Sequence, residues 1–207
     1  MTYLAPVIGG LPKDNAERHR YMKGHQIAGT SENRERVDND YYATPEASVK
    51  ALLEREAITY PVLEPACGDG AISRLLTGGR VASSDLIDRG FGVGGIDFLT
   101  NDWNDTHQTV ITNPPFSLFT EFVKKGLEVA QEKLILFGKL QALEGEKRGT
   151  YLATTPLRTV YVFKKRQNPL RNGVAVDENG KPWASTMAFA WFVWEKGYIG
   201  KPTIEWI

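Results

Sequence analysis

The sequence has only one cysteine, no excess of charge of either sign and no long apolar run. The single cysteine, Cys67, excludes an intrachain disulfide and a Cys-rich zinc site. Because 25 Lys and Arg residues balance 25 Asp and Glu residues, a nucleic-acid partner would need a local basic patch. No apolar run could span a membrane, and residues 1–10 lack the charged flank of a signal peptide. We therefore expect a soluble, cytoplasmic protein.

The composition is that of a globular chain with one domain. Of its 207 residues, 42% are hydrophobic and 11% aromatic, which suffices for a packed core. Residues 1–40 differ, because they are polar and charged with little periodicity. We expect a polar arm over residues 1–40, mobile when no ligand is bound, and a single domain over residues 41–207.

Short apolar runs alternate with helical periodicity along most of this domain. Strand-like runs lie at 62–64, 81–84, 110–112 and 134–137. Helical spacing follows Thr44-Pro45, where Thr44 is a candidate N-cap, and also follows Gly70 and Asn113. The last third has longer strand-like runs at 159–163, 187–194 and 203–206. This alternation predicts an α/β protein with a parallel sheet and helices on both faces.

Chemically suggestive residues stand where three of the predicted strands end or lead into a loop. The turn Glu64–Gly70 contains Gly68 and Gly70, which let the backbone approach a ligand closely. Asp85 ends the next strand and can accept hydrogen bonds from both hydroxyls of a ribose. After a glycine-rich loop, Asp97 can accept from an adenine amino group and Phe98 can flank its ring. Since ligands of open α/β sheets bind beyond the carboxyl ends of strands, these residues predict a nucleotide-like site.

The sharpest signal is Asn113-Pro114-Pro115-Phe116, directly after the run at 110–112. Two consecutive prolines fix φ and remove two amide donors, so this turn presents its oxygen atoms rigidly. The Asn113 side-chain oxygen and the Pro114 carbonyl can accept both N–H bonds of one amino group. This directs the nitrogen lone pair away from the ring of a planar base, and Phe116 offers a face for that base to stack on.

Three segments in this order resemble the DNA adenine-N6 methyltransferases. They are Tyr42-Ala43-Thr44-Pro45, the run from Val62 to Gly70, and Asn113-Pro114-Pro115-Phe116, which together are similar to the γ arrangement. The chain from Leu143 onwards resembles the small phage- and prophage-type enzymes. The resemblance implies a Rossmann-like class I methyltransferase fold. In it, a mostly parallel seven-stranded sheet has helices on both faces and an antiparallel C-terminal strand.

The resemblance also implies an activity and a set of site residues. The activity is methyl transfer from S-adenosylmethionine to the N6 amine of a flipped-out adenine in double-stranded DNA, leaving S-adenosylhomocysteine and using no metal. The target base would be held by Asn113, Pro114, Pro115 and Phe116. The cofactor would be held by Tyr42, Thr44, Pro45, Glu64, Pro65, Cys67, Gly68, Gly70, Asp85, Leu86, Asp97, Phe98 and Asn113. We do not expect Cys67 to act as a nucleophile, because no histidine stands beside it in the sequence.

The chain leaves no room for a separate target-recognition domain, so recognition should fall to loops near 139–155 and 164–185. Basic residues outnumber acidic ones between Lys139 and Arg171, which is the local patch that neutral bulk charge had hidden. Those predicted to bind DNA are Lys139, Lys147, Arg148, Lys164, Lys165, Arg166 and Arg171. We expect a monomer or a weak dimer.

Several alternatives remain open at this point. The same Asn113 turn suits other planar amines, namely guanine N2 in RNA and glutamine N5 in protein, whereas cytosine N4 more often goes with serine at this position. A module that binds cofactor and DNA without catalysis is another alternative. A nicotinamide dehydrogenase is disfavoured, because Ser73 stands where its glycine fingerprint would need a third glycine.

Overall fold

The computed structural model describes residues 41–104, 106–171, 180 and 187–207. The arm predicted over residues 1–40 and much of the second predicted recognition loop (172–179 and 181–186) lie outside the described residues. None of the helices in the described part is long and apolar enough to span a membrane.

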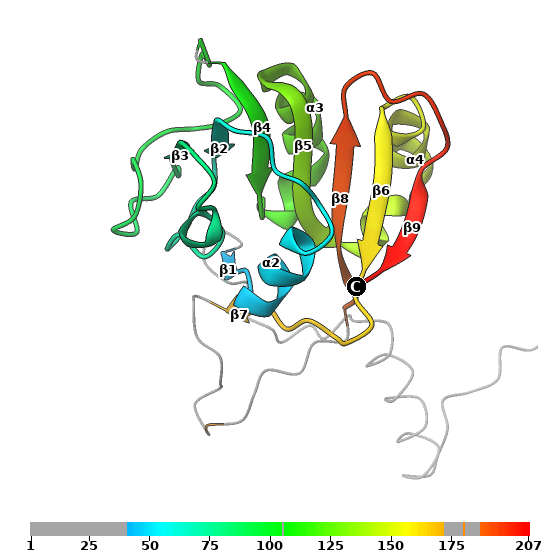
Figure 1. Ribbon diagram of the computed structural model, residues 1–207, viewed down its shortest axis with the longest axis horizontal. Coiled ribbons are helices and arrows are strands. Elements are labelled where there is room, and N and C mark those ends of the chain that lie inside the picture. Colours follow the sequence, from blue (N-terminus) through cyan, green and yellow to red (C-terminus); the bar gives the residue numbers. More distant parts are fainter. Residues whose placement is uncertain (1–40, 105, 172–179, 181–186) are drawn as a thin grey trace, which may run out of the picture. The chain divides into compact units, whose positions relative to one another are not determined.

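A seven-stranded sheet in the order β3-β2-β4-β5-β8-β6-β9 forms the middle layer (Figure 1). Every neighbouring pair is parallel except the two that involve β8, which is antiparallel to β5 and β6. The strands are β2 (Val62–Glu64), β3 (Val81–Ser83), β4 (His107–Thr112), β5 (Ala130–Lys139), β6 (Leu157–Val162), β8 (Phe189–Glu195) and β9 (Thr203–Trp206). A separate antiparallel pair joins β1 (Tyr42–Ala43) to β7 (Leu170–Arg171). The mostly parallel sheet with an antiparallel strand near the C-terminus is therefore confirmed.

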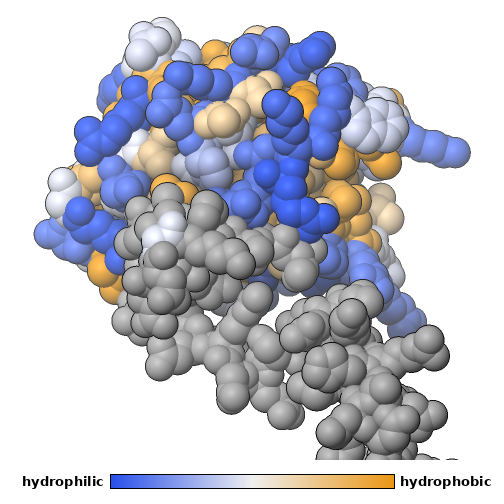
Figure 2. Space-filling view, turned by 90° about the horizontal axis from the view of Figure 1, so that it is seen from below, coloured by the Kyte–Doolittle hydropathy of each residue, from blue (hydrophilic) through white to orange (hydrophobic). Residues whose placement is uncertain are grey.

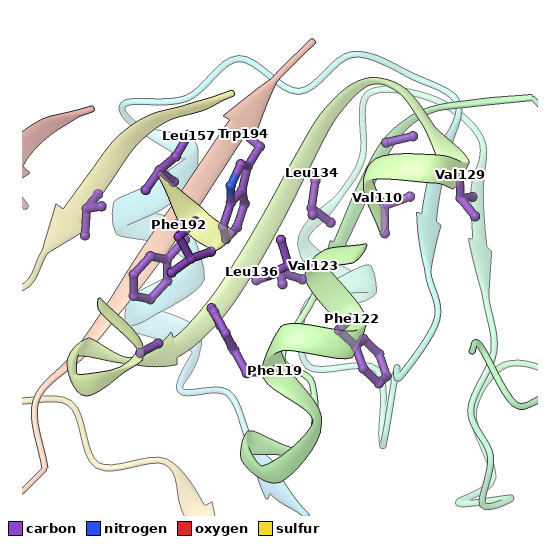
Figure 3. Packing of buried hydrophobic residues seen from close by; sticks show 14 of the residues in the cluster. Val110, Phe119, Phe122, Val123, Val129, Leu134, Leu136, Leu157, Phe192 and Trp194 are labelled. Carbon is purple, nitrogen blue, oxygen red and sulfur yellow. The ribbon is translucent and has the colours of Figure 1, made fainter. Parts of the chain in front are cut away.

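Helices cover both faces of the sheet, as the alternation predicted. Side chains alternate along β5, so Leu134 and Leu136 belong to one apolar cluster and Ile135 and Phe137 to the other. The first cluster contains buried residues of α3 (Phe119–Val129) and α4 (Glu146–Leu152). Figure 3 shows side chains of α3 pointing toward those of β5 and β8. The second cluster contains residues of α2 (Glu46–Leu53).

Two helix predictions were wrong in detail. The helix expected after Gly70 is a single 3-10 turn, η2 (Ser73–Leu75), because Leu76 already takes an extended conformation. Gly78 and Gly79 pack so tightly on the Tyr60 ring that an added Cβ would lie within 3 Å of it, so this segment closes over the core without further helix. Thr44 caps no helix, since α2 begins at Glu46 with Pro45 at the N-cap position and no side-chain cap.

The first predicted recognition loop, 139–155, is also mostly helical. It contains η4 (Leu140–Leu143) and α4, and the side chains of Ala142 and Leu152 are buried in the core. Because the composition of this segment is mostly polar, the sequence did not indicate that these two side chains are buried. Its folded form is therefore an ordered element on the α3 side of the sheet.

Candidate active site

A hollow of about 790 Å³, part of it open to solvent, lies at the carboxyl ends of β2, β3 and β4. This size is ordinary for a small-molecule site. It is lined by all but two of the residues predicted to hold a cofactor: Tyr42, Thr44, Glu64, Pro65, Cys67, Gly68, Asp85, Leu86, Asp97, Phe98 and Asn113. Pro45 and Gly70 do not line it. Segments more than seventy residues apart in sequence thus meet at one edge of the sheet.

The glycine turn after β2 is held by contacts that leave no space for side chains. Gly68 has φ +56°, and a Cβ there would lie 2.6 Å from the Tyr41 ring. Gly70 has φ +85°, and its Cβ would meet the Phe91 ring at 2.6 Å. Both positions therefore require glycine for conformational and steric reasons. Gly70 supports the site by shaping the turn rather than by lining the hollow.

Glu64, at the end of β2, is fully buried beneath this turn. Its carboxyl group accepts hydrogen bonds from the backbone N–H and the hydroxyl of Ser73, and that hydroxyl also contacts the Ser83 hydroxyl at 2.7 Å. Burial, together with the nearby charges of Asp69 and Asp85, raises the pKa of Glu64 from 4.5 to about 8 in spite of the Ser73 bonds. At neutral pH this carboxyl group is therefore largely protonated in the cofactor-free protein.

Asp85 joins the glycine turn to the loop after β3. Its carboxylate accepts from the backbone N–H of Gly68 at 2.8 Å and of Ile87 at 2.9 Å. Each carboxylate oxygen has more than one lone pair, so Asp85 can still accept from a ligand hydroxyl. Its position at the hollow fits the predicted role toward a ribose.

Asp97 and Phe98 both line the hollow. Asp97 accepts from the Leu99 N–H at 2.9 Å, which fixes the carboxylate. Phe98 is only 2% exposed and packs on Trp103 and Phe122. Phe98 is thus a core residue that also lines the hollow, and its ring is held in place by its neighbours.

Cys67 has no chemical role that the geometry supports. It is buried, its thiol donates to the Phe91 carbonyl at 3.4 Å, and burial with the charges of Glu64 and Asp85 raises its pKa to about 12. Since the thiolate is the nucleophilic form, this thiol is unreactive at neutral pH.

Asn113 is oriented by the backbone of β1. Its side-chain N–H donates to the Tyr42 carbonyl at 2.6 Å, so the Oδ1 atom is the one left to accept from a ligand. Pro115 lines the hollow together with Asn113, whereas Pro114 and Phe116 do not. Pro114 is buried, and Phe116 is partly buried beside the hollow.

Among the described residues, two aromatic rings and one cation contact the Phe116 ring. Tyr42 stacks on it with centroids 5.4 Å apart, Phe189 packs at 5.5 Å, and the Lys139 ammonium lies 4.7 Å from its centroid. A base that stacks on Phe116 must displace one of these. Lys139, at the end of β5, has the most flexible of the three side chains.

Sequence reasoning missed Tyr41 and Arg89, which both line the hollow. The Arg89 guanidinium lies 4.0 Å from the Tyr41 ring centroid, and within the described part of the chain its Nε is buried without a hydrogen-bond partner. Arg89 brings a positive charge to the hollow. The other charged side chains among the described lining residues are carboxyl groups, those of Glu64, Asp69, Asp85 and Asp97. No motif marks Arg89, because only the folded loop after β3 brings it there.

The predicted DNA-binding residues differ in their surroundings. Arg148 is tied to the backbone, since it donates to the carbonyls of Gln141, Ala142 and Glu144 and so closes the end of η4. The run Lys164–Arg166 after β6 is exposed, and so is Lys147 on α4. The side chain of Arg171 lies outside the described part.

No protein-family model and no curated protein matches the sequence, but solved structures match the fold. One is a protein from Listeria monocytogenes assigned to the class I S-adenosylmethionine-dependent methyltransferases (TM-score 0.56, 15% identity, 92% of this chain and 73% of that one). The fold is that of the class I methyltransferases.

Two other matching structures are modification proteins of type I restriction enzymes. The Vibrio vulnificus protein has a TM-score of 0.51 and 12% identity over 93% of this chain and 51% of that one. The EcoKI M protein has a TM-score of 0.51 and 16% identity over 77% and 45%. The chain spans about half the length of these two proteins.

Proposed function

We propose that this protein transfers a methyl group from S-adenosylmethionine to the N6 amine of adenine in double-stranded DNA. The observation that carries the proposal is the orientation of Asn113, whose N–H is bound to the Tyr42 carbonyl beside the hollow. This leaves an amide oxygen as acceptor next to a carbonyl that two prolines hold rigidly. The likeness in fold to modification proteins of restriction enzymes supports DNA as the substrate.

The residues of the hollow fit the proposed cofactor. Asp85 can accept from ribose hydroxyls and Asp97 from an adenine amine, and both carboxylates are fixed by backbone N–H groups. Arg89, whose Nε has no hydrogen-bond partner among the described residues, can bind the carboxylate of the methionine part. When bound, S-adenosylmethionine supplies a methyl group on a positively charged sulfur, and the carboxyl groups of the hollow favour that charge.

The Asn113 turn would act on the amine of the target base. Two N–H bonds, one to the Asn113 oxygen and one to the Pro114 carbonyl, hold the amine and leave its lone pair aimed at the methyl group. Transfer would form an N–C bond to this amine, and the electron pair of the broken S–C bond would remain on the departing sulfur. Asn113 is too weak a base to take the proton, so the methylated amine releases it to water. Positioning and electrostatics therefore supply the catalysis.

The test is transfer of tritiated methyl from S-adenosylmethionine to unmethylated duplex DNA, followed by nucleoside analysis of the product. N6-methyladenine is expected. Label in RNA guanine or in protein glutamine would overturn the assignment of DNA as the substrate, but the assignment of the Asn113 site would stand. Cofactor binding without transfer to any acceptor would favour a non-catalytic binding module.

Variants sharpen this test. Asn113→Ala should abolish transfer and leave cofactor affinity within a few-fold of wild type. The matched control is Asn104→Ala, at an exposed position before β4 at the opposite edge of the sheet. If Asn113→Ala methylated DNA at the wild-type rate, the assignment of the Asn113 turn would be refuted.

A further inference from the structure

The edge strand β9 exposes two large apolar side chains that no described element covers. Ile204 is 55% and Trp206 62% exposed. They pair with Val160 and Val162 of β6, so both lie on the face of the sheet that α3 and α4 cover elsewhere. Two neighbouring apolar side chains exposed on one face of an edge strand form a contiguous patch, and such patches are candidate contact surfaces.

Trp206 lies at the same edge of the sheet as the candidate active site. The strands β2, β4 and β5 are parallel to one another. Because β8 is antiparallel to both β5 and β6, β6 runs in the same direction as β5. The strand β9 is parallel to β6 and so shares this direction. The carboxyl end of β9 is therefore on the side of the Asn113 turn, and Figure 1 draws the C-terminus at the lower end of the sheet, the end where β1 and β7 lie. Four strand spacings separate β4 from β9, which amounts to about 19 Å.

A basic run leaves β6 directly beside Trp206. The Lys164 N–H donates to the Ile207 carbonyl at 2.8 Å, and the Ile207 N–H donates to the Val162 carbonyl at 3.0 Å. Lys164, Lys165 and Arg166 are all exposed. The acidic residue of β9, Glu205, pairs with Tyr161 and so lies on the opposite face of the sheet. In Figure 2, apolar residues gather beside hydrophilic ones on the side where Figure 1 draws β6 and β9.

This combination of side chains fits nucleic acid. Cations neutralise phosphates, and an indole packs against the flat, apolar parts of nucleotides. A duplex advances about 3.4 Å per base pair, so about 19 Å corresponds to between five and six pairs. A duplex whose target base lies at Asn113 can therefore reach Trp206.

We propose that Trp206, with Lys164, Lys165 and Arg166, forms a second DNA contact about 19 Å from the methyl-transfer site. The proposal rests on the proposed function and deepens it by assigning a flank-binding surface to the edge of the sheet. Trp206 packs on a nucleotide of the flank while the basic run contacts the phosphates. The surface lengthens the bound site beyond the base that is methylated.

The test measures duplex affinity of the full chain at several salt concentrations, together with kcat and KM for methyl transfer. Trp206→Ala should weaken DNA binding about fivefold or more and raise KM, with kcat and the salt dependence nearly unchanged. Trp206→Phe should retain most of the affinity. Lys164→Ala should instead reduce the slope of log K against log salt by about one.

The matched control is Ile199→Ala. Ile199 is 97% exposed but lies between the end of β8 and the start of β9, at the opposite edge of the sheet. The Ile199→Ala variant should bind DNA with the affinity of the wild type. If Trp206→Ala binds and methylates DNA as wild type does, this inference is overturned and the proposed function stands. If the wild-type chain binds no DNA, the proposed function fails together with it.

Discussion

Replacing Glu64 by glutamine should make the stability of the cofactor-free protein less dependent on pH. Burial raises the pKa of Glu64 from 4.5 to about 8, so the folded state holds a proton that the unfolded chain releases. Its contribution to stability is therefore fully present below pH 4.5 and is lost as the pH rises toward 8. Glutamine resembles the protonated form and keeps an oxygen that can accept from Ser73.

The magnitude follows from the size of the pKa shift. Each pH unit in this window costs about 1.4 kcal/mol. Between pH 5 and pH 8 the wild type should lose about 3 to 4 kcal/mol more than Glu64→Gln. For a chain of this length that corresponds to a relative change in Tm of about 10 °C.

Thermal melts of wild type and Glu64→Gln at half-unit pH steps would measure this difference, in which titrations of other groups cancel. The matched control is Glu54→Gln, at an exposed position just after α2, whose pH profile should follow wild type. Parallel profiles for wild type and Glu64→Gln would show that Glu64 is ionised in the folded protein, contrary to this reasoning.

Two further substitutions probe other buried groups. Lys133→Met should destabilise the protein by about 2 kcal/mol in urea unfolding, because it removes one of the cations that pair with the buried Glu56 carboxylate, leaving Arg158; unchanged stability would show that Arg158 and the Tyr161 hydroxyl satisfy Glu56 on their own. Cys67→Ser should keep methyl transfer within a few-fold of wild type, because the buried thiol, with its pKa raised to about 12, is not a nucleophile; complete loss of transfer with cofactor binding intact would contradict this.

The fold was predictable wherever short apolar runs stood between turns. The carboxyl-terminal positions of β2, β3 and β4 followed from such runs, so Glu64, Asp85 and Asn113 were placed correctly at one edge of the sheet. Strand β5 was expected over four residues but spans Ala130–Lys139. Residues 131–133 are polar, and Lys133 is buried because it pairs with Glu56 and donates to the Ala57 carbonyl.

The features that escaped prediction depend on contacts between distant segments. Arg89 reaches the hollow by stacking on Tyr41, and Arg148, which is predicted to bind DNA, closes the end of η4. Neither contact has a spacing that periodicity can detect. The orientation of Asn113 likewise depends on β1, whose pairing partner β7 lies more than a hundred residues further along the chain.

That orientation leads to a final prediction, for the Asn113→Asp variant. Aspartate has the same shape and accepts hydrogen bonds more strongly, so an account based on acceptor strength alone predicts activity at least as high as wild type. Its carboxylate cannot donate to the Tyr42 carbonyl, however, and an oxygen placed 2.6 Å from that carbonyl would be repelled. The side chain should turn away, and kcat should fall about 100-fold.

The pH dependence of kcat separates the two accounts. Protonation would give the Asn113→Asp carboxyl an O–H that can donate to the Tyr42 carbonyl, so the ratio of variant to wild-type kcat should rise as the pH falls from 8 to 5.5. Cofactor affinity, measured by calorimetry, should stay close to wild type throughout. If the variant matched wild type at pH 8, the Tyr42 carbonyl would not be what orients this side chain. The account based on acceptor strength alone would then hold, and the side-chain oxygen at position 113 would need no orientation by β1.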